Sequence, residues 1–101
     1  MKGATGHYRF DDESKVFFGS PVLHLIQRGD RLVGRFGRRG VVRGSISDGS
    51  MEASWKSGER CGWIRARFDP RRRVFEGVYG LGETSSPPAG HCLARAGSGR
   101  Q

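Results

Sequence analysis

Few side chains in this sequence are of the kinds that perform chemistry, and their spacing matches no complete catalytic or metal-binding signature. His7, His24 and His91 are isolated from one another, so a three-ligand metal site would have to be assembled from different strands. The two cysteines, Cys61 and Cys92, are likewise far apart in the chain. We therefore expect no catalytic residue, no metal and no cofactor, and the pattern leans away from an enzyme.

Arginine gives the chain its strongest chemical bias. The sequence carries fifteen arginines and three lysines, and its formal net charge is +8. Guanidinium groups favour carboxylate and phosphate partners, so this charge favours nucleic acid, an acidic protein or a phosphorylated ligand. A solvated surface is the alternative explanation. An interface for nucleic acid or protein, in which an exposed tryptophan lies among cations, is predicted at Arg35, Trp63, Arg65 and Arg67.

The length and the termini indicate one small domain. One hundred and one residues suit a single domain over 1–101, with 1–5 and 97–101 expected as flexible tails. The first six residues contain no apolar run typical of a signal peptide, and no stretch is long enough to span a membrane. These features predict a cytoplasmic protein without membrane contact, whose cysteines are reduced thiols. A homo-oligomer is left open.

Turn-forming residues recur at short intervals, and the segments between them alternate apolar with polar side chains. This alternation is the period of a half-buried strand, and no segment shows a helical stripe. The fold class predicted is all-β: an eight-stranded antiparallel up-and-down meander that closes into a small barrel, with a sandwich or half-open roll as the alternative. The expected strands are 6–11, 21–27, 31–37, 40–46, 51–56, 61–68, 73–81 and 91–96.

The alternation assigns an inside and an outside to the barrel, because burying many unpaired guanidinium groups would cost too much free energy. The residues expected inside are Tyr8, Phe10, Leu32, Phe36, Val42, Ile46, Met51, Trp55, Ile64, Phe68, Phe75, Tyr79 and Leu81. The residues expected outside are Arg9, Arg31, Arg35, Arg43, Glu52, Lys56, Arg65, Arg67, Glu76 and Arg95. His24 faces outward if Gly29-Asp30 is a two-residue turn, and inward if the turn has three residues.

A glycine precedes an aromatic residue by two positions in three of the expected strands. The triplets begin at Gly6, Gly34 and Gly77, and each places a missing side chain beside a large one on the same face. Glycine in a strand either allows close packing and curvature or leaves room for a ligand. Both outcomes occur in eight-stranded barrels. The belt formed by Gly34, Gly44, Ala53 and Gly77 therefore decides whether the barrel is solid or hollow.

The run Leu23–Phe36, LHLIQRGDRLVGRF, resembles the early hairpin of avidin- and streptavidin-like barrels, an architecture shared with lipocalin-like barrels. Further glycine-x-aromatic strands in that family correspond to Gly6–Tyr8 and Gly77–Tyr79 here. The resemblance implies a small apolar ligand inside the barrel, with tryptophans such as Trp55 and Trp63 lining the pocket. Phe36 stands where the family has a tyrosine, and the chain has no asparagine, which argues against biotin itself.

Two long loops, 11–20 and 82–91, are expected at the same end of the barrel, which makes that end the mouth. The function predicted is binding of a small apolar or acidic amphiphilic ligand in the interior. The alternatives are a basic module for nucleic acid or an acidic protein, and a cyclase- or isomerase-type barrel enzyme with an enclosed apolar cavity. The ligand contacts expected are Tyr8, Phe36, Trp55, Phe75, Tyr79, Arg38 and Arg39.

Overall fold

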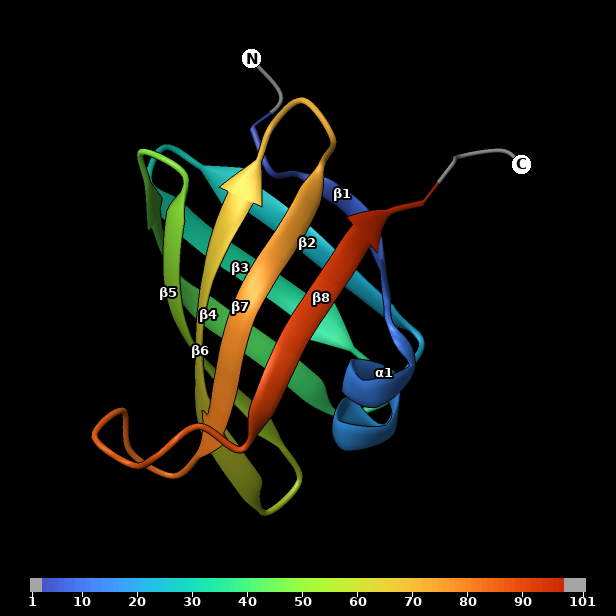
Figure 1. Cartoon of the computed structure of the whole chain (residues 1–101), viewed down its shortest axis with the longest axis vertical. Helices are drawn as coiled ribbons and strands as arrows, with labels where there is room; N and C mark the ends of the chain where they lie inside the picture. Colours follow the sequence, from blue (N-terminus) through green and yellow to red (C-terminus); the bar gives the residue numbers. More distant parts are fainter. Residues whose placement is uncertain (1–2, 98–101) are drawn as a thin grey trace.

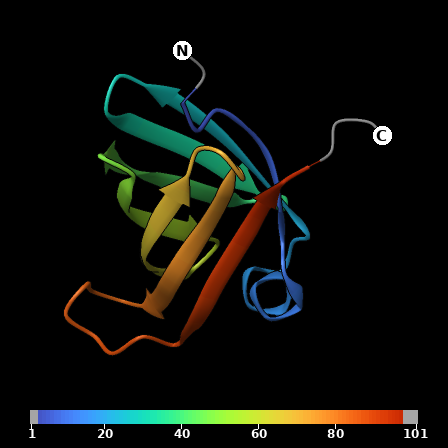
Figure 2. The ribbon, with the colours of Figure 1, turned by 45° about the horizontal axis from the view of Figure 1, so that its top comes forward.

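A computed structural model describes residues 3–97, which form one closed barrel of eight antiparallel strands in simple up-and-down order. Figure 1 shows the strands and the one short helix at the lower end of the barrel. Figure 2 shows the same strands following one another around the wall. The elements are β1 (Gly6–Phe10), α1 (Asp12–Phe18), β2 (Val22–Arg28), β3 (Arg31–Phe36), β4 (Gly40–Ser47), β5 (Ser50–Ser57), β6 (Arg60–Asp69), β7 (Val74–Leu81) and β8 (Gly90–Ala96).

The predicted fold class is confirmed, and every strand end lies within one residue of its expected position. Two-residue turns fix the register of the β2–β3, β4–β5 and β5–β6 hairpins. Arg28 pairs with Arg31 across Gly29, whose φ is +62°, so His24 points outward and is exposed. Asp48 and Gly49 both have positive φ, the conformation that an Asp-Gly turn supplies between two strands. Of the two alternatives for the turn at Gly29-Asp30, the structure has the two-residue turn, with His24 facing outward.

Residues 11–20, expected to be a loop, contain the helix α1. The Asp11 side chain caps its first turn by accepting a hydrogen bond from the Ser14 amide at 2.9 Å. Gly19 ends the helix with φ +68°, and its amide donates to the Lys15 carbonyl at 2.9 Å. These capping residues were visible in the sequence. The helix was missed because seven residues are too few for a helical stripe to stand out from the neighbouring strand pattern.

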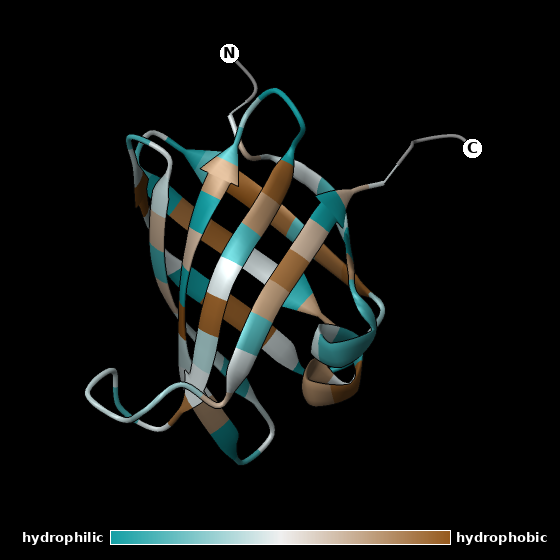
Figure 3. Ribbon diagram, viewed as in Figure 1, coloured by the Kyte–Doolittle hydropathy of each residue, from teal (hydrophilic) through white to brown (hydrophobic). Residues whose placement is uncertain are grey.

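The assignment of inside and outside is confirmed with one exception. Every residue expected outside is exposed, and those expected inside are buried apart from Leu81, which ends β7 and is 47% exposed. The alternating colours along the strands in Figure 3 show the same division. Leu81 was assigned inside by alternation alone, but the core does not extend to the last residue of the strand. The core also contains Leu23, Leu25, Ala66, Cys92 and Ala94.

The glycine belt is packed. A Cβ built on Gly77 would overlap the Arg65 carbonyl oxygen on the neighbouring strand, and one on Gly44 would overlap the Glu52 carbonyl oxygen. These glycines therefore allow neighbouring strands to approach closely, rather than leaving a hollow at mid-height. The packing explanation of the repeat fits the structure.

The end of the barrel opposite α1 is closed by residues 3–5. Ala4 is fully buried, and its carbonyl accepts a hydrogen bond from the Tyr8 hydroxyl at 2.7 Å. Arg73 donates to the carbonyls of Gly3 and Thr5 at 3.0 and 2.7 Å. Residues 3–5, expected as part of a tail, therefore have backbone groups with hydrogen-bond partners on the barrel. Residues 1–2 and 98–101 of the expected tails lie outside the described residues.

Candidate functional site

Three of the aromatic residues predicted to contact a ligand meet at the mouth of the barrel, where α1 covers them. Phe36, Trp55 and Tyr79 come from β3, β5 and β7, and we call them the mouth box. The Phe17 ring stacks on Tyr79 with centroids 4.1 Å apart, and the Phe18 ring lies 5.2 Å from Phe36 and 5.5 Å from Trp55. The helix thus inserts its two aromatic side chains into the mouth, and we call α1 the plug.

The other two predicted aromatic contacts lie in the closed half of the barrel. Tyr8 packs edge-on against Phe75 with centroids 5.1 Å apart, and Phe75 lies 4.6 Å from Phe68. Arg73 lies above this cluster, with its guanidinium carbon 5.7 Å from the Phe68 ring centre. Tyr8 and Phe75 are therefore core residues that the structure does not bring to the mouth.

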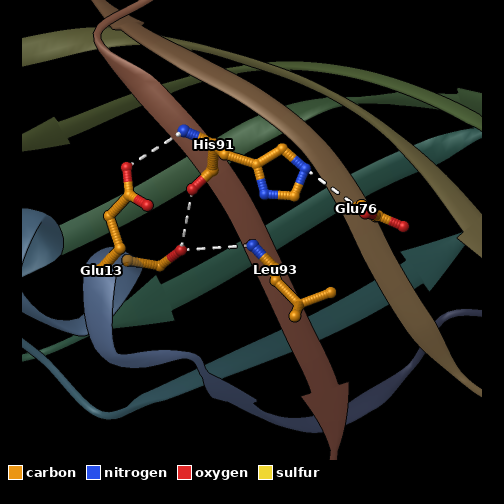
Figure 4. Close-up of polar contacts among 5 residues, drawn as sticks. Glu13, Glu76, His91 and Leu93 are labelled. Carbon is orange, nitrogen blue, oxygen red and sulfur yellow. Dashed lines mark hydrogen bonds and ion pairs between the residues drawn. The ribbon is translucent and has the colours of Figure 1, made fainter.

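A few polar contacts hold the plug on β8, as Figure 4 shows. The Ser14 hydroxyl accepts from the Leu93 amide at 3.2 Å and donates to the His91 carbonyl at 3.4 Å. Glu13 accepts from the His91 amide at 3.4 Å. The carboxyl side of the helix is held by Arg60, which donates to the Phe17 carbonyl at 3.2 Å. The Asp11 amide adds a donor to the Leu93 carbonyl at 3.0 Å, and with it the plug is still held by fewer hydrogen bonds than a strand of the wall.

Trp55 carries an unsatisfied polar group beneath the plug. Its side chain is 2% exposed, and its indole Nε1 is the buried side-chain nitrogen for which the described residues offer no hydrogen-bond partner. Leaving a buried donor unpaired costs about 1–3 kcal/mol, and native proteins rarely tolerate it without a reason. The mouth box therefore contains a buried donor, beside Gly62 of β6, that an acceptor would stabilise.

Arg60 places a positive charge at the rim of the mouth box. Its guanidinium carbon lies 4.9 Å from the Phe17 ring centre and 5.7 Å from the Trp55 ring centre, and the side chain is exposed. Arg38 and Arg39, predicted as the cationic ligand contacts, are exposed in the turn between β3 and β4. Arg39 lines a groove on the outer wall whose lining also includes Trp55, so this groove borders the mouth box from outside. Arg60, the first residue of β6, is the cation beside the box, and it was not among the predicted ligand contacts.

Cys92 lies beneath the plug on the inner face of β8. Burial raises the pKa of its thiol to about 12, the Asp11 carboxylate adds to this rise, and a hydrogen bond with Ser14 opposes it. The pKa of the Tyr79 hydroxyl is also raised, by burial and by the nearby Glu13 carboxylate. Both groups are therefore neutral at neutral pH. Both cysteines are free thiols, as expected. Cys61 is exposed on the outer face of the wall, whereas Cys92 is buried on its inner face.

Trp63 is not the exposed platform that the sequence suggested. Its side chain is on the outer face of β6, but the connection between β7 and β8 folds over it and leaves it 2% exposed. Its Nε1 donates to the Ser86 hydroxyl at 3.0 Å. The Arg65 guanidinium packs over the indole at 4.9 Å and donates to the Thr84 carbonyl at 2.9 Å. The Trp63 side chain is therefore covered and hydrogen-bonded within the protein, and it is not exposed to a partner.

The cations grouped with Trp63 do not form one surface with it. Arg67, on the same strand, donates to the Ser50 hydroxyl at 2.9 Å and pairs in register with Glu76. Arg35 is on β3, three strands away around the wall, which corresponds to about 14 Å at the usual strand spacing. The predicted meander already implies this separation, which the grouping of Arg35 with Trp63 did not take into account.

Two of the three histidines lie side by side, and the third is on another strand. His7 and His24 are cross-strand neighbours on the outer wall, with stacked rings 3.9 Å apart, and His91 lies 3.4 Å from the Glu76 carboxylate. Among residues 3–97, no three His, Cys, Asp or Glu side chains gather as a metal site. None of the helices in the same range is long and apolar enough to cross a membrane.

No family model matches the chain, and comparison with curated proteins and with solved structures found no similar protein. The closed eight-stranded barrel agrees with an avidin- or lipocalin-like architecture at the level of the fold alone. A function therefore has to be argued from the residues of the mouth and of the outer wall.

Proposed function

We propose that the protein binds a small apolar or acidic amphiphilic ligand at the mouth of the barrel, where the ligand takes the place of the plug's aromatic side chains. The observation that carries the proposal is the unpaired Trp55 Nε1, buried in an aromatic box whose cover is a helix of seven residues. The belt below the box is packed, so this site is limited to the mouth half of the interior.

The groups around the box define the chemistry of the ligand. Tyr79 and Trp55 offer ring faces and edges to an apolar body, since they already hold Phe17 and Phe18 in this way. The Trp55 Nε1 donor calls for an acceptor atom within the buried part of the ligand. Arg60, once released from the Phe17 carbonyl, supplies a cation for an acidic head group at the rim.

The plug acts in this proposal as a built-in competitor. Burying a phenylalanine side chain is worth about 1.5–3 kcal/mol, so expelling the buried Phe18 costs about that much and the half-buried Phe17 costs less. A ligand recovers this free energy by burying its own apolar surface in the box and by pairing with Trp55. The apparent affinity is lowered by the small fraction of molecules in which the plug is open.

Calorimetric titration with decanoate, and with decanol as a ligand without the acidic group, tests the proposal. The double variant Phe17→Ala/Phe18→Ala should bind decanoate at least about tenfold more tightly than the parent, because it no longer fills the box. Val16→Ala, which changes a residue of the same helix that is 78% exposed, is the matched control and should bind like the parent.

The Arg60→Gln variant distinguishes the contribution of the ligand's acidic head group to binding from that of its apolar part. It should weaken decanoate binding several-fold and leave decanol binding unchanged, because only the carboxylate loses its partner. Failure of decanoate to bind to either the parent or the double variant, with both shown to be folded by near-ultraviolet circular dichroism, would contradict the proposal.

The packed belt gives no support to the cyclase or isomerase alternative, which requires an enclosed cavity at mid-height.

A further inference from the structure

Two neighbouring grooves on the outer wall are lined by cations. The first has a volume of about 610 Å³ and is lined in part by Arg39, Arg43 and Lys56. The second has a volume of about 680 Å³ and is lined in part by Arg28, Arg31 and again Arg43. Because Arg43 on β4 borders both, the grooves form one surface across β2 to β6, which we call the cationic face.

The charge of the cationic face is uncompensated. Neither groove is lined by a carboxylate from any described residue, although Asp30 and Glu52 lie nearby on the wall and its turns. The ion pairs found within residues 3–97 are Lys15 with Asp12 and His91 with Glu76, so no cation of this face takes part in one. The grooves on the other side of the barrel are different, since their linings include Glu52, Glu76 and Asp69.

The centre of the cationic face is aliphatic. Ile26 and Val33 are cross-strand neighbours on β2 and β3, and they are 52% and 47% exposed. Val33 pairs in register with Arg43 on its other side, so the apolar pair adjoins the cation that the grooves share. Apolar side chains at the centre with arginines around them are the usual composition of a protein interface.

We propose that the cationic face binds an acidic polypeptide segment that places apolar side chains on Ile26 and Val33 and carboxylates on the surrounding cations. Trp55 lines the first groove, so the cationic face adjoins the mouth, but the inference is argued from outer-wall side chains alone and does not rest on the ligand proposed there. Single-stranded nucleic acid is the less suitable partner, because its binding relies on exposed aromatic rings that stack on the bases. The exposed side chains at the centre of this face are aliphatic, and the outer-wall tryptophan, Trp63, is covered.

Fluorescence anisotropy with three labelled probes tests the inference on the full chain. The probes are a short synthetic peptide in which glutamates flank a pair of leucines, the same peptide with serines in place of the leucines, and oligothymidylate. The leucine peptide should bind several-fold more tightly than the serine peptide, because only the former covers Ile26 and Val33. It should also bind more tightly than oligothymidylate at the same salt concentration.

A pair of charge-reversing variants locates the binding surface. Arg31→Glu/Arg43→Glu should weaken binding of the leucine peptide by about tenfold or more. Arg9→Glu/Arg95→Glu makes the same change of charge at a cross-strand pair on β1 and β8, and it should leave binding within about twofold of the parent. Equal losses in the two double variants would show attraction to net charge alone. Equal binding of the leucine and serine peptides, or tighter binding of oligothymidylate, would likewise overturn the inference.

Discussion

Replacement of Gly77 by alanine measures whether the glycine belt is packed. A Cβ at this position would overlap the Arg65 carbonyl oxygen and lie about 2.5 Å from the Ala66 Cα, and both atoms belong to the backbone of β6. Backbone atoms cannot turn aside as a side chain does, so β6 and β7 would have to separate locally. Such overpacking costs about 1–3 kcal/mol, which exceeds the gain of about 0.4–1 kcal/mol from restricting the unfolded chain.

The expected net loss for Gly77→Ala is about 2 kcal/mol in the free energy of unfolding. For a domain of this size, that loss lowers the melting temperature by roughly 10 °C. Gly97→Ala is the matched control, because the nearest heavy atom to its added Cβ, the His7 carbonyl oxygen, is 3.8 Å away. Urea and thermal denaturation give both quantities. A Gly77→Ala variant as stable as Gly97→Ala would refute the close approach of β6 and β7 at Gly77.

Three further predictions concern buried and bridging groups. Because the pKa of Cys92 rises from 9.0 to about 12 on folding, the unfolded chain loses its proton first, and stability falls as pH rises above about 9. By about pH 10.5 this loss is about 2 kcal/mol, and denaturation of Cys92→Ala should show a smaller loss between pH 8 and 10.5 than the parent. Ser86→Ala leaves the Trp63 Nε1 donor unpaired and should cost about 1–2 kcal/mol in urea denaturation, whereas the exposed Ser85→Ala should cost almost nothing. Arg73→Ala removes the donors to Gly3 and Thr5 and should lower the melting temperature by several degrees, with the exposed Arg72→Ala as the neutral control. An unchanged pH profile in Cys92→Ala, or equal stability within either of the other pairs, would contradict the corresponding contact.

The strands and their facing were predictable from the sequence because both depend on local rules. Alternation with a period of two residues assigned Trp55 and Tyr79 to the inside and Arg43 to the outside. Turn residues such as Gly29 and Asp48 set the hairpin register. Closure of the barrel followed, because sequential hairpins leave two edges that can pair with each other, as β1 and β8 do here.

The parts of the site that could not be predicted depend on contacts between distant segments. Phe17 and Phe18 read as part of a loop, and nothing local shows that they enter the mouth over Tyr79. Trp63 was correctly assigned to the outer face, but its cover comes from Ser86, which is 23 residues away along the chain. The strand order, by contrast, followed from the predicted meander, and it brings Arg28, Arg31 and Arg43 around one groove.

Amide hydrogen exchange in α1, measured by mass spectrometry with and without saturating decanoate, tests most directly whether a ligand replaces the plug. The reporter is the segment 11–20, in which the Lys15 and Gly19 amides donate to the Asp11 and Lys15 carbonyls. If the ligand occupies the mouth box, these amides should exchange faster with decanoate, while those of β3, β5 and β7 stay protected or gain protection. Unchanged or stronger protection of α1 at saturation would contradict displacement of the plug and, with it, the proposed binding site.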